Sequence, residues 1–277
     1  MDYLTALLLG LVQGLTEFLP ISSSAHISIV GQLVGQEDPG AAFTAITQLG
    51  TEAAVVLYFW RDITTIIRKW SLALVGKVAR DDPDVRMGWL VIIGSIPIGV
   101  LGIVFKDQIE TTLRSLWLTA TMLLVFAVVI EVAERLGRQR RELSELTWKH
   151  GIGFGLFQAL ALVPGVSRSG GTIAGGLFMG YTREAAARYS FLLAIPAVVA
   201  SGGLQVLEVV GGSAEGSGGT AWGPIWAATA VAFVVGYAVI AWFMRYITTH
   251  TFTPFVVYRI LLALGLYAML GTGVLSA

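Results

Sequence analysis

Apolar residues run in long stretches along this chain, and six of the stretches are long enough to cross a bilayer as helices. They lie near 42–60, 87–105, 116–133, 190–208, 225–244 and 255–275. An α-helix rises about 1.5 Å per residue, so a run of ~20 apolar residues covers the ~30 Å of hydrocarbon in a membrane. The pattern therefore predicts an all-α membrane protein with six transmembrane helices.

Two further apolar runs are too short to cross the bilayer and end in helix-breaking, polar sequence. Residues 3–15 lead into Thr16-Glu17, Pro20 and three serines, and residues 151–163 lead into Pro164-Gly165 and Ser167-Arg168-Ser169. Proline ends a helix, and irregular backbone at membrane depth is tolerated only where it is buried in protein or lines a cavity. Each short run therefore predicts a re-entrant helical hairpin.

The two short runs also resemble each other when they are aligned without gaps at an offset of 145 residues. The matching pairs are Gly10 with Gly155, Leu11 with Leu156, Gln13 with Gln158, Leu15 with Leu160, Ser22 with Ser167 and Ser24 with Ser169. Each half of the chain then contains one hairpin and three spans. An odd number of spans turns the second half upside down relative to the first. We therefore expect one membrane domain, 1–277, built from an inverted repeat of about 1–134 and about 147–277.

The positions of lysine and arginine give an independent prediction of orientation. These residues fill the connections 61–86 and 134–150, whereas 106–115 holds only two of them and 209–224 holds none. Basic connections lie on the cytoplasmic side of a membrane. Both termini are then expected outside the cytoplasm, with the first hairpin entering from the exterior and the second from the cytoplasm.

Composition agrees with a membrane protein and excludes several kinds of chemistry. The chain is 55% hydrophobic and 13% charged, and its mean hydropathy is +0.75. The formal net charge is zero, so no nucleic-acid partner is expected. The absence of cysteine excludes disulfides, thiol catalysis and cysteine-bound metals. The N-terminus lacks the basic stretch of a secretory signal, so we expect its first apolar run to belong to the mature protein.

The first hairpin carries a carboxylate, a serine cluster and a histidine. Gln13 and Glu17 are four residues apart and share one helix face. An acidic residue at mid-membrane costs ~2.5–3.5 kcal/mol on insertion scales, so Glu17 should face a polar cavity, a cation or a metal. The alternative is a protonated, structural Glu17 that hydrogen-bonds to the broken helix. Glu52 and Glu131, also inside predicted spans, lie away from the helix breaks and from any polar cluster, and structural pairing or an interfacial position is expected for both.

Three serines, 22–24, stand where a second short helix would begin, and at least one of them could act as its N-cap. His26 follows Ser23 by three residues and could share its face, which would let the imidazole accept a proton from the serine hydroxyl. Attack by Ser23 is one hypothesis. The other is direct attack by water, assisted by His26 or Glu17.

The second hairpin, residues 164–172, has the character of an oxyanion site. Its glycines allow close approach of the backbone, its hydroxyls donate hydrogen bonds, and Arg168 offers a planar fork of donors to phosphate oxygens. The alternative, in which Arg168 pairs with Glu17 between the repeats, would describe a resting state.

These motifs resemble the two signature segments of the undecaprenyl-diphosphatase, or bacitracin-resistance, family. The resemblance rests on the Gln13-to-Glu17 pair, the run Glu-Phe-Leu-Pro-Ile-Ser-Ser-Ser-Ala-His from Glu17, and Pro-Gly-Val-Ser-Arg-Ser-Gly-Gly-Thr from Pro164. It covers nearly the whole chain. It implies hydrolysis of undecaprenyl diphosphate to the monophosphate and inorganic phosphate, which recycles the carrier lipid for cell-wall synthesis.

The same resemblance implies roles for individual residues. It assigns catalysis to Ser23, His26, Glu17 and Arg168, and a divalent cation, with Mg²⁺ as first candidate and Ca²⁺ as second, to Glu17 and Gln13. Phosphate binding is expected from residues of both hairpins: Arg168, Ser167, Ser169, Thr172 and Ser22. Gln13 stands where many members have a second glutamate, which the family motif tolerates but which weakens any metal site built on two carboxylates.

An anion or lipid transporter is the main alternative, because inverted repeats with re-entrant hairpins also build transporters. The serine and histidine favour an enzyme, since a transporter needs no proton-transfer group. The expected location is the inner (plasma) membrane, with the site opening to the extracytoplasmic side. The expected partners are the polyprenyl diphosphate and membrane lipids, and a homodimer is an open alternative to a monomer.

Overall fold

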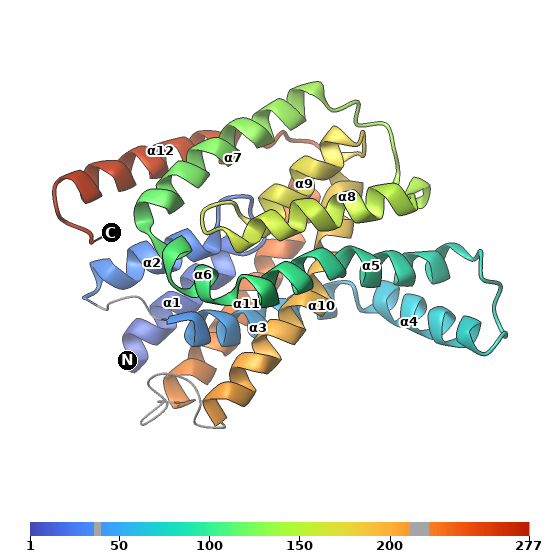
Figure 1. Cartoon of the computed structure of the whole chain (residues 1–277), viewed down its shortest axis with the longest axis horizontal. Coiled ribbons are helices and arrows are strands. Elements are labelled where there is room, and N and C mark those ends of the chain that lie inside the picture. Colours follow the sequence, from blue (N-terminus) through green and yellow to red (C-terminus); the bar gives the residue numbers. More distant parts are fainter. Residues whose placement is uncertain (36–39, 211–221, 277) are drawn as a thin grey trace.

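The computed structural model describes residues 1–35, 40–210 and 222–276, and within these ranges all regular elements are helical. The α-helices are α1 (Tyr3–Thr16), α2 (Ser23–Leu33), α3 (Gly40–Tyr58), α4 (Trp60–Leu74), α5 (Pro83–Val104), α6 (Lys106–Glu110), α7 (Leu116–Leu136), α8 (Trp148–Ala159), α9 (Arg168–Phe178), α10 (Arg183–Val210), α11 (Trp222–Tyr246) and α12 (Thr253–Gly271). Short 3-10 helices cover Thr112–Arg114, Leu143–Glu145 and Leu160–Leu162. Figure 1 shows α5, α8 and α12 running roughly along the long axis of the molecule, whereas α10 and α11 cross it steeply.

Five of the described helices, α5, α7, α10, α11 and α12, are long and apolar enough to cross a membrane. They correspond to five of the six predicted spans. The sixth, near 42–60, forms α3, whose interior contains Thr47, Thr51 and Glu52, all buried. The all-helical membrane fold is therefore confirmed at this coarser level. The predicted exterior connection 209–224 falls mostly outside the described residues.

Each short apolar run forms a helix, a break and a second helix. In the first, α1 ends at Thr16 and α2 begins at Ser23, with Pro20 between them. The break passes through Ser22 at φ 71° and ψ 93°. In the second, α9 begins directly after Ser167, at φ 70° and ψ 120°. Few residues other than glycine adopt such a conformation, and here two serines do so at positions 145 residues apart.

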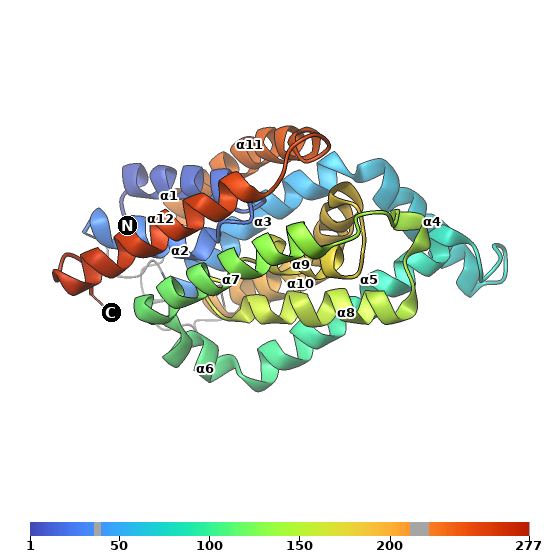
Figure 2. The same ribbon diagram turned by 90° about the horizontal axis from the view of Figure 1, so that it is seen from above.

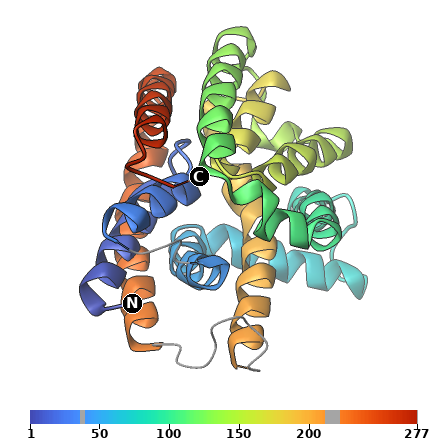
Figure 3. The ribbon, with the colours of Figure 1, turned by 60° about the vertical axis from the view of Figure 1, so that its left-hand side comes forward.

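The helices of the two hairpins pack on long helices from the other half of the chain. Helix α1 lies against α11, and α8 lies against α5. Both contacts depend on glycine, because a Cβ added at Gly10 would collide with the backbone of Ala228 and one added at Gly155 would collide with the backbone of Gly94. Helices α3 and α10 also pack together, as do α7 and α12. Figure 3 brings the end that carries both termini forward.

The tips of the two hairpins meet near the middle of the molecule (Figures 1 and 2). Both termini lie at one end, whereas the α4–α5 turn and the α7–α8 connection lie at the other. The largest cluster of buried apolar residues takes in Phe18 from the first hairpin and Phe154 and Ile173 from the second, and it also draws on α3, α5, α7, α10, α11 and α12. Both hairpins are thus anchored in the core of the fold.

A partly exposed cluster of ion pairs stabilises the α4–α5 connection. Lys69 donates to Asp82 at 3.1 Å and to Asp84 at 2.7 Å. Asp82 caps α5 by accepting from the Asp84 amide at 2.9 Å. The Lys69 hydrogen bond, followed by that amide, holds the pKa of Asp82 below its ordinary value. The stabilisation is present at neutral pH and is lost as pH falls through this lowered pKa.

Candidate active site

Glu17, at the break of the first hairpin, is the centre of a buried polar cluster that joins both hairpins. Its Oε2 accepts hydrogen bonds from Gln13 Nε2 at 2.8 Å and from Ser23 Oγ at 2.6 Å. Its Oε1 accepts one from Arg168 Nη2 at 2.6 Å. Glu17 and Gln13 share a face, as predicted from their spacing. The predicted resting pair of Glu17 and Arg168 is also confirmed.

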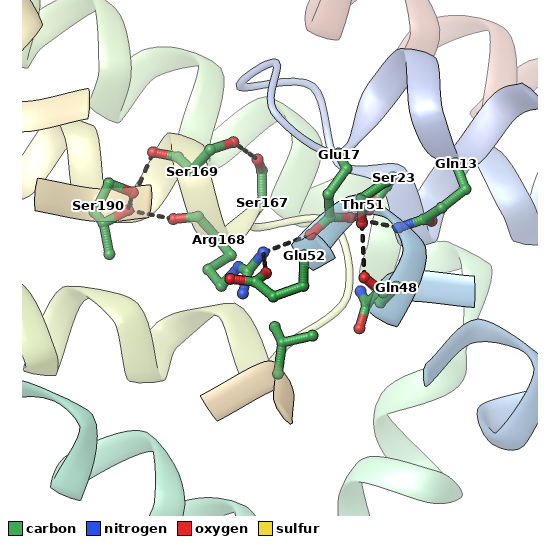
Figure 4. Close-up of polar contacts among 12 residues, drawn as sticks. Gln13, Glu17, Ser23, Gln48, Thr51, Glu52, Ser167, Arg168, Ser169 and Ser190 are labelled. Carbon is green, nitrogen blue, oxygen red and sulfur yellow. Dashed lines mark hydrogen bonds and ion pairs between the residues drawn. The ribbon is translucent and has the colours of Figure 1, made fainter. Parts of the chain in front are cut away.

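Arg168 starts α9, and its guanidinium reaches between two carboxylates (Figure 4). Besides Glu17, its Nη2 lies 3.7 Å from Oε2 of Glu52 on α3. Its Nη1 is buried and has no hydrogen-bond partner among the described residues. A guanidinium binds phosphate oxygens best through two parallel N–H donors. The N–H groups of Nη1 are available to donate to a phosphate oxygen.

The expectation that Glu52 lies apart from the polar cluster was wrong. Glu52 follows Gln48 by one helical turn on α3, and its carboxylate lies beside Arg168. The two residues are more than a hundred positions apart, so sequence spacing cannot show this contact. The expectation for Glu131 is confirmed: its carboxylate pairs with Arg135 at 2.6 Å and accepts from Thr253 at 3.2 Å, away from the site.

His26 does not contact Ser23 in this structure, in contrast to the predicted pairing. Its Nδ1 donates to the Ser22 carbonyl at 2.7 Å, and its Nε2 meets the Tyr258 hydroxyl of α12 at 2.6 Å. The imidazole follows Ser22 by four residues on α2, so its Nδ1 faces the carbonyl one turn back. The Ser23 hydroxyl instead donates to Glu17 at 2.6 Å, and the catalytic role expected of His26 stays a prediction.

The hydroxyls of the second hairpin mostly support its backbone. Ser167 accepts from the Gly170 amide at 3.2 Å and lies 3.1 Å from the Ser169 hydroxyl, which donates to the Leu19 carbonyl of the first hairpin at 3.0 Å. Thr172 donates to the Arg168 carbonyl at 2.6 Å and contacts Ser190 on α10. Ser167 is therefore a working N-cap. Ser22 occupies the same position before α2, but its side chain caps no amide.

Arg259, on α12, was missed by the sequence analysis and fixes the geometry of both breaks. It is fully buried. Its guanidinium donates to the carbonyls of Pro20 at 3.0 Å and Gly165 at 2.7 Å, one in each hairpin. Further carbonyl acceptors, at 3.2–3.3 Å, are those of Met122, Leu123 and Val166. An arginine inside a predicted span was the available signal, because charged residues at membrane depth are rare and have partners.

The oxygen atoms of the cluster suit a hard divalent cation. Gln13 Oε1 and both Glu52 oxygens are buried and accept no hydrogen bond from the described residues. Mg²⁺ prefers oxygen ligands, keeps several waters and commonly takes one or two carboxylates. The described residues contain no group of three or more His, Cys, Asp or Glu placed to hold a metal, so the fit is to a cation that retains water.

Two surface cavities lie away from this cluster. One, of about 370 Å³, is lined by residues that include the ion pair of Asp62 and Arg188, whose atoms lie 2.6 Å apart. The other, of about 240 Å³, is an apolar groove between α4, α5 and α10. Neither is lined by the hairpin residues, so the chemical argument rests on the buried cluster.

Comparison with known proteins shows a close match over the whole chain. The family described as Bacitracin resistance protein BacA matches residues 6–265. An undecaprenyl-diphosphatase of Pseudarthrobacter chlorophenolicus is 63% identical over 279 residues, and one of Micrococcus luteus is 63% identical over 278, each covering all of both chains. An undecaprenyl-diphosphatase 2 of Streptomyces avermitilis is 56% identical over 288 residues, covering all of this chain and 97% of the relative.

Proposed function

Because this chain belongs to the bacitracin resistance protein BacA family, we propose that it hydrolyses undecaprenyl diphosphate to undecaprenyl phosphate and inorganic phosphate. The similar proteins bear the name undecaprenyl-diphosphatase. The observation that carries the proposal is the meeting of Ser23, Glu17 and Arg168 from two hairpins in one buried cluster. A transporter needs no hydroxyl held against a carboxylate, so this alternative is not favoured.

In the proposed reaction, the Ser23 oxygen attacks the terminal phosphorus and Glu17 accepts the hydroxyl proton. The bond between phosphorus and the bridging oxygen breaks, and undecaprenyl phosphate leaves with that oxygen. Water then attacks the phosphorus of the phosphoserine and returns a proton to the Ser23 oxygen, inorganic phosphate is released, and Glu17 gives up its proton to the phosphate product or to water. A serine hydroxyl becomes a good nucleophile when a base lies within hydrogen-bond reach, and the 2.6 Å contact with Glu17 meets that condition. In the second route, Glu17 activates water directly.

We propose that Arg168 stabilises the negative charge on the transferred phosphoryl group. Its Nη1 has no hydrogen-bond partner in the described structure. The hydroxyls of Ser22, Ser167 and Ser169, at the hairpin breaks, remain predicted hydrogen-bond donors to the phosphate. Thr172 is buried, and its hydroxyl already contacts Arg168 and Ser190, so its proposed role is to hold the start of α9. His26 is proposed to position Ser22 and the adjacent Ser23 through the Ser22 carbonyl.

A divalent cation, with Mg²⁺ first and Ca²⁺ second, is part of the proposal. Glu17 and the free amide oxygen of Gln13 are its proposed protein ligands, chosen because oxygen donors suit these ions. When bound, the cation would neutralise charge on the diphosphate, which one arginine cannot balance. The residues themselves hold the serine, orient the phosphate and accept the proton.

We also propose that the fold is an inverted repeat with six spans and two re-entrant hairpins, the halves being about 1–134 and about 147–277. The exchanged packing of α1 on α11 and α8 on α5 supports this proposal, as does the shared backbone conformation of Ser22 and Ser167. The proposed location is the inner membrane, with the site open to the extracytoplasmic side. Right-side-out vesicles should then hydrolyse added diphosphate lipid, and activity confined to inverted vesicles would contradict that side. A homodimer stays a prediction.

The function is tested by measuring phosphate release from undecaprenyl diphosphate by the purified full chain in detergent, with and without Mg²⁺. Ser23→Ala should lower turnover by roughly three orders of magnitude or more if attack is covalent, and acid quenching of the parent protein should trap phosphate on Ser23. Ser201→Ala is the matched control, because that hydroxyl only contacts the Val198 carbonyl of its own helix at 3.3 Å. Substantial turnover by Ser23→Ala would favour direct water attack. No release by the parent protein would refute the function.

A further inference from the structure

Glu52 carries a carboxylate that the protein leaves without a hydrogen bond. The residue is only 2% exposed, and neither oxygen accepts from any described donor. Its one charged neighbour among the described ion pairs is Arg168, at 3.7 Å, beyond ordinary hydrogen-bond distance. Burying a carboxylate without compensation is costly, so this geometry points to a ligand that the protein alone does not supply.

The charges of the cluster do not balance. Glu17 and Glu52 face one guanidinium, and that guanidinium is committed to Glu17 at 2.6 Å. In their ionised forms the three groups sum to one excess negative charge in a buried place. A divalent cation would compensate this charge, and it would also attract the diphosphate that the proposed function brings to the site.

The oxygens that remain free decide which carboxylate can serve a cation. Both oxygens of Glu17 are already engaged, Oε1 by Arg168 and Oε2 by Gln13 and Ser23. Among the described residues, no donor contacts either oxygen of Glu52 or Gln13 Oε1. Glu17 is thus well placed as the base for Ser23, and it could bind a cation only by sharing an oxygen that already accepts hydrogen bonds, whereas both oxygens of Glu52 can bind a cation directly.

We propose that Glu52 is a carboxylate ligand of the divalent cation. The general base, Glu17, then comes from the first hairpin, and the main metal-binding carboxylate comes from α3. The inference rests on the proposed function for its purpose but not for its test, because cation binding is measured without the lipid. Glu52 supplies the second carboxylate that the α1 pair, with glutamine at position 13, lacks.

The test measures binding of Mn²⁺, a paramagnetic substitute for Mg²⁺, to the full chain in detergent by electron paramagnetic resonance. Glu52→Gln keeps the shape of the side chain and removes its charge, and it should weaken Mn²⁺ binding at least tenfold. Glu52→Asp should bind with intermediate affinity. Glu131→Gln is the matched control, because it removes a carboxylate of another long helix that is paired with Arg135 outside the site, and it should bind Mn²⁺ as the parent does.

The competing role for Glu52 is to orient Arg168 only. In that case Glu52→Gln would bind Mn²⁺ with the affinity of the parent chain, and the inference would be overturned. Absence of saturable Mn²⁺ binding by the parent chain would overturn it as well. Thermal unfolding of each variant without metal shows whether a substitution merely unfolds the protein. If Glu52→Gln does not fold, the Mn²⁺ affinity of Glu52→Asp decides: a reduced affinity supports the inference, and the affinity of the parent chain overturns it. Mn²⁺ binding that depends on Glu52, in a chain that releases no phosphate from the lipid, would refute the proposed function and leave the cation site standing.

Discussion

Arg168 combines a committed and an uncommitted side on one guanidinium, and this division is expected to matter in catalysis. Nη2 contacts Glu17, whereas Nη1 is buried and has no hydrogen-bond partner in the described part of the chain. Lysine keeps the positive charge but is a point donor, so it cannot hold Glu17 and a phosphate oxygen in the same plane. Loss of a preorganised donor of this kind lowers turnover by roughly 10²–10³.

We therefore expect Arg168→Lys to lose two to three orders of magnitude in turnover on undecaprenyl diphosphate while the protein remains folded. Arg188→Lys is the control, because Arg188 pairs with the partly exposed Asp62 and not with the hairpins, and it should retain activity. A fully active Arg168→Lys variant would remove the guanidinium fork from the mechanism.

At the scale of residues, sequence motifs predicted most of the cluster and missed its long-range partners. Helix spacing explains why Gln13 and Glu17 lie together, and Ser23 follows them across the short break between α1 and α2. Glu52 and Arg259 sit alone inside apolar runs, and their partners are more than ninety positions away in sequence. The partner of His26 has a local explanation: a three-residue spacing allows a contact with Ser23, but the imidazole instead turns to the Ser22 carbonyl.

At the scale of elements, Arg259 of α12 links the two helix breaks. It donates to carbonyls that the interrupted helices leave without intrahelical donors, at Pro20 in one hairpin and at Gly165 and Val166 in the other. Each hydrogen bond to a charged group contributes about 1.5–3 kcal/mol net. Its removal should therefore loosen both hairpin tips together.

We expect Arg259→Met to lower stability by ~3–5 kcal/mol, because several buried carbonyls lose their donor. Turnover should fall along with the thermal midpoint, measured in detergent. Arg135→Met is the control: Arg135 is largely exposed and pairs within its own helix with Glu131, so little change is expected. An unchanged midpoint for Arg259→Met would show that the breaks hold their shape without this side chain.

Two glycines set the distance between hairpin helices and the long helices behind them. Gly10→Ala would press α1 away from α11, and Gly155→Ala would press α8 away from α5, since in each case the new Cβ meets backbone. Overpacking of this kind costs about 1–3 kcal/mol. Both variants should lower the thermal midpoint.

Gly265→Ala is the matched control within α12, because nothing lies within 4 Å of its added Cβ. It should leave stability unchanged or raise it by up to ~1 kcal/mol, the helix propensity difference between glycine and alanine. A similar loss in all three variants would mean that glycine flexibility, and not close packing, is what these helices require.

At the scale of the whole molecule, the sequence predicted the number of long apolar helices better than the relation between them. Charge and the 145-residue offset indicated which ends lie together, and the termini do lie at one end of the fold, opposite the α4–α5 turn (Figure 2). The offset could not predict that α1 packs against α11 and α8 against α5. Hydrophobic periodicity shows which face of a helix is buried, but not which helix covers that face.

The proposed orientation predicts opposite accessibility for the two ends. The chain has no cysteine, so single cysteines can be placed at the exposed positions Ala79, after α4, and Val274, after α12. In intact cells, a membrane-impermeant maleimide should label Val274→Cys and spare Ala79→Cys until the membrane is permeabilised. Labelling of both positions in intact cells would contradict the inverted repeat.

The exchange of packing partners between the halves has a consequence for how the protein is made. Gly10 of α1 packs against Ala228 of α11. The first hairpin is therefore synthesised some 218 residues before the part of α11 against which it packs. At a synthesis rate of about 5–20 residues per second, that is a wait of roughly 10–40 seconds. Throughout it, the nascent hairpin lacks its main packing partner, although α1 can already contact α3, and Glu17 lacks Arg168 for most of the time. Insertion machinery or the bilayer surface must shelter it, and a chain cut short before α11 would be an obvious target for membrane quality-control proteases.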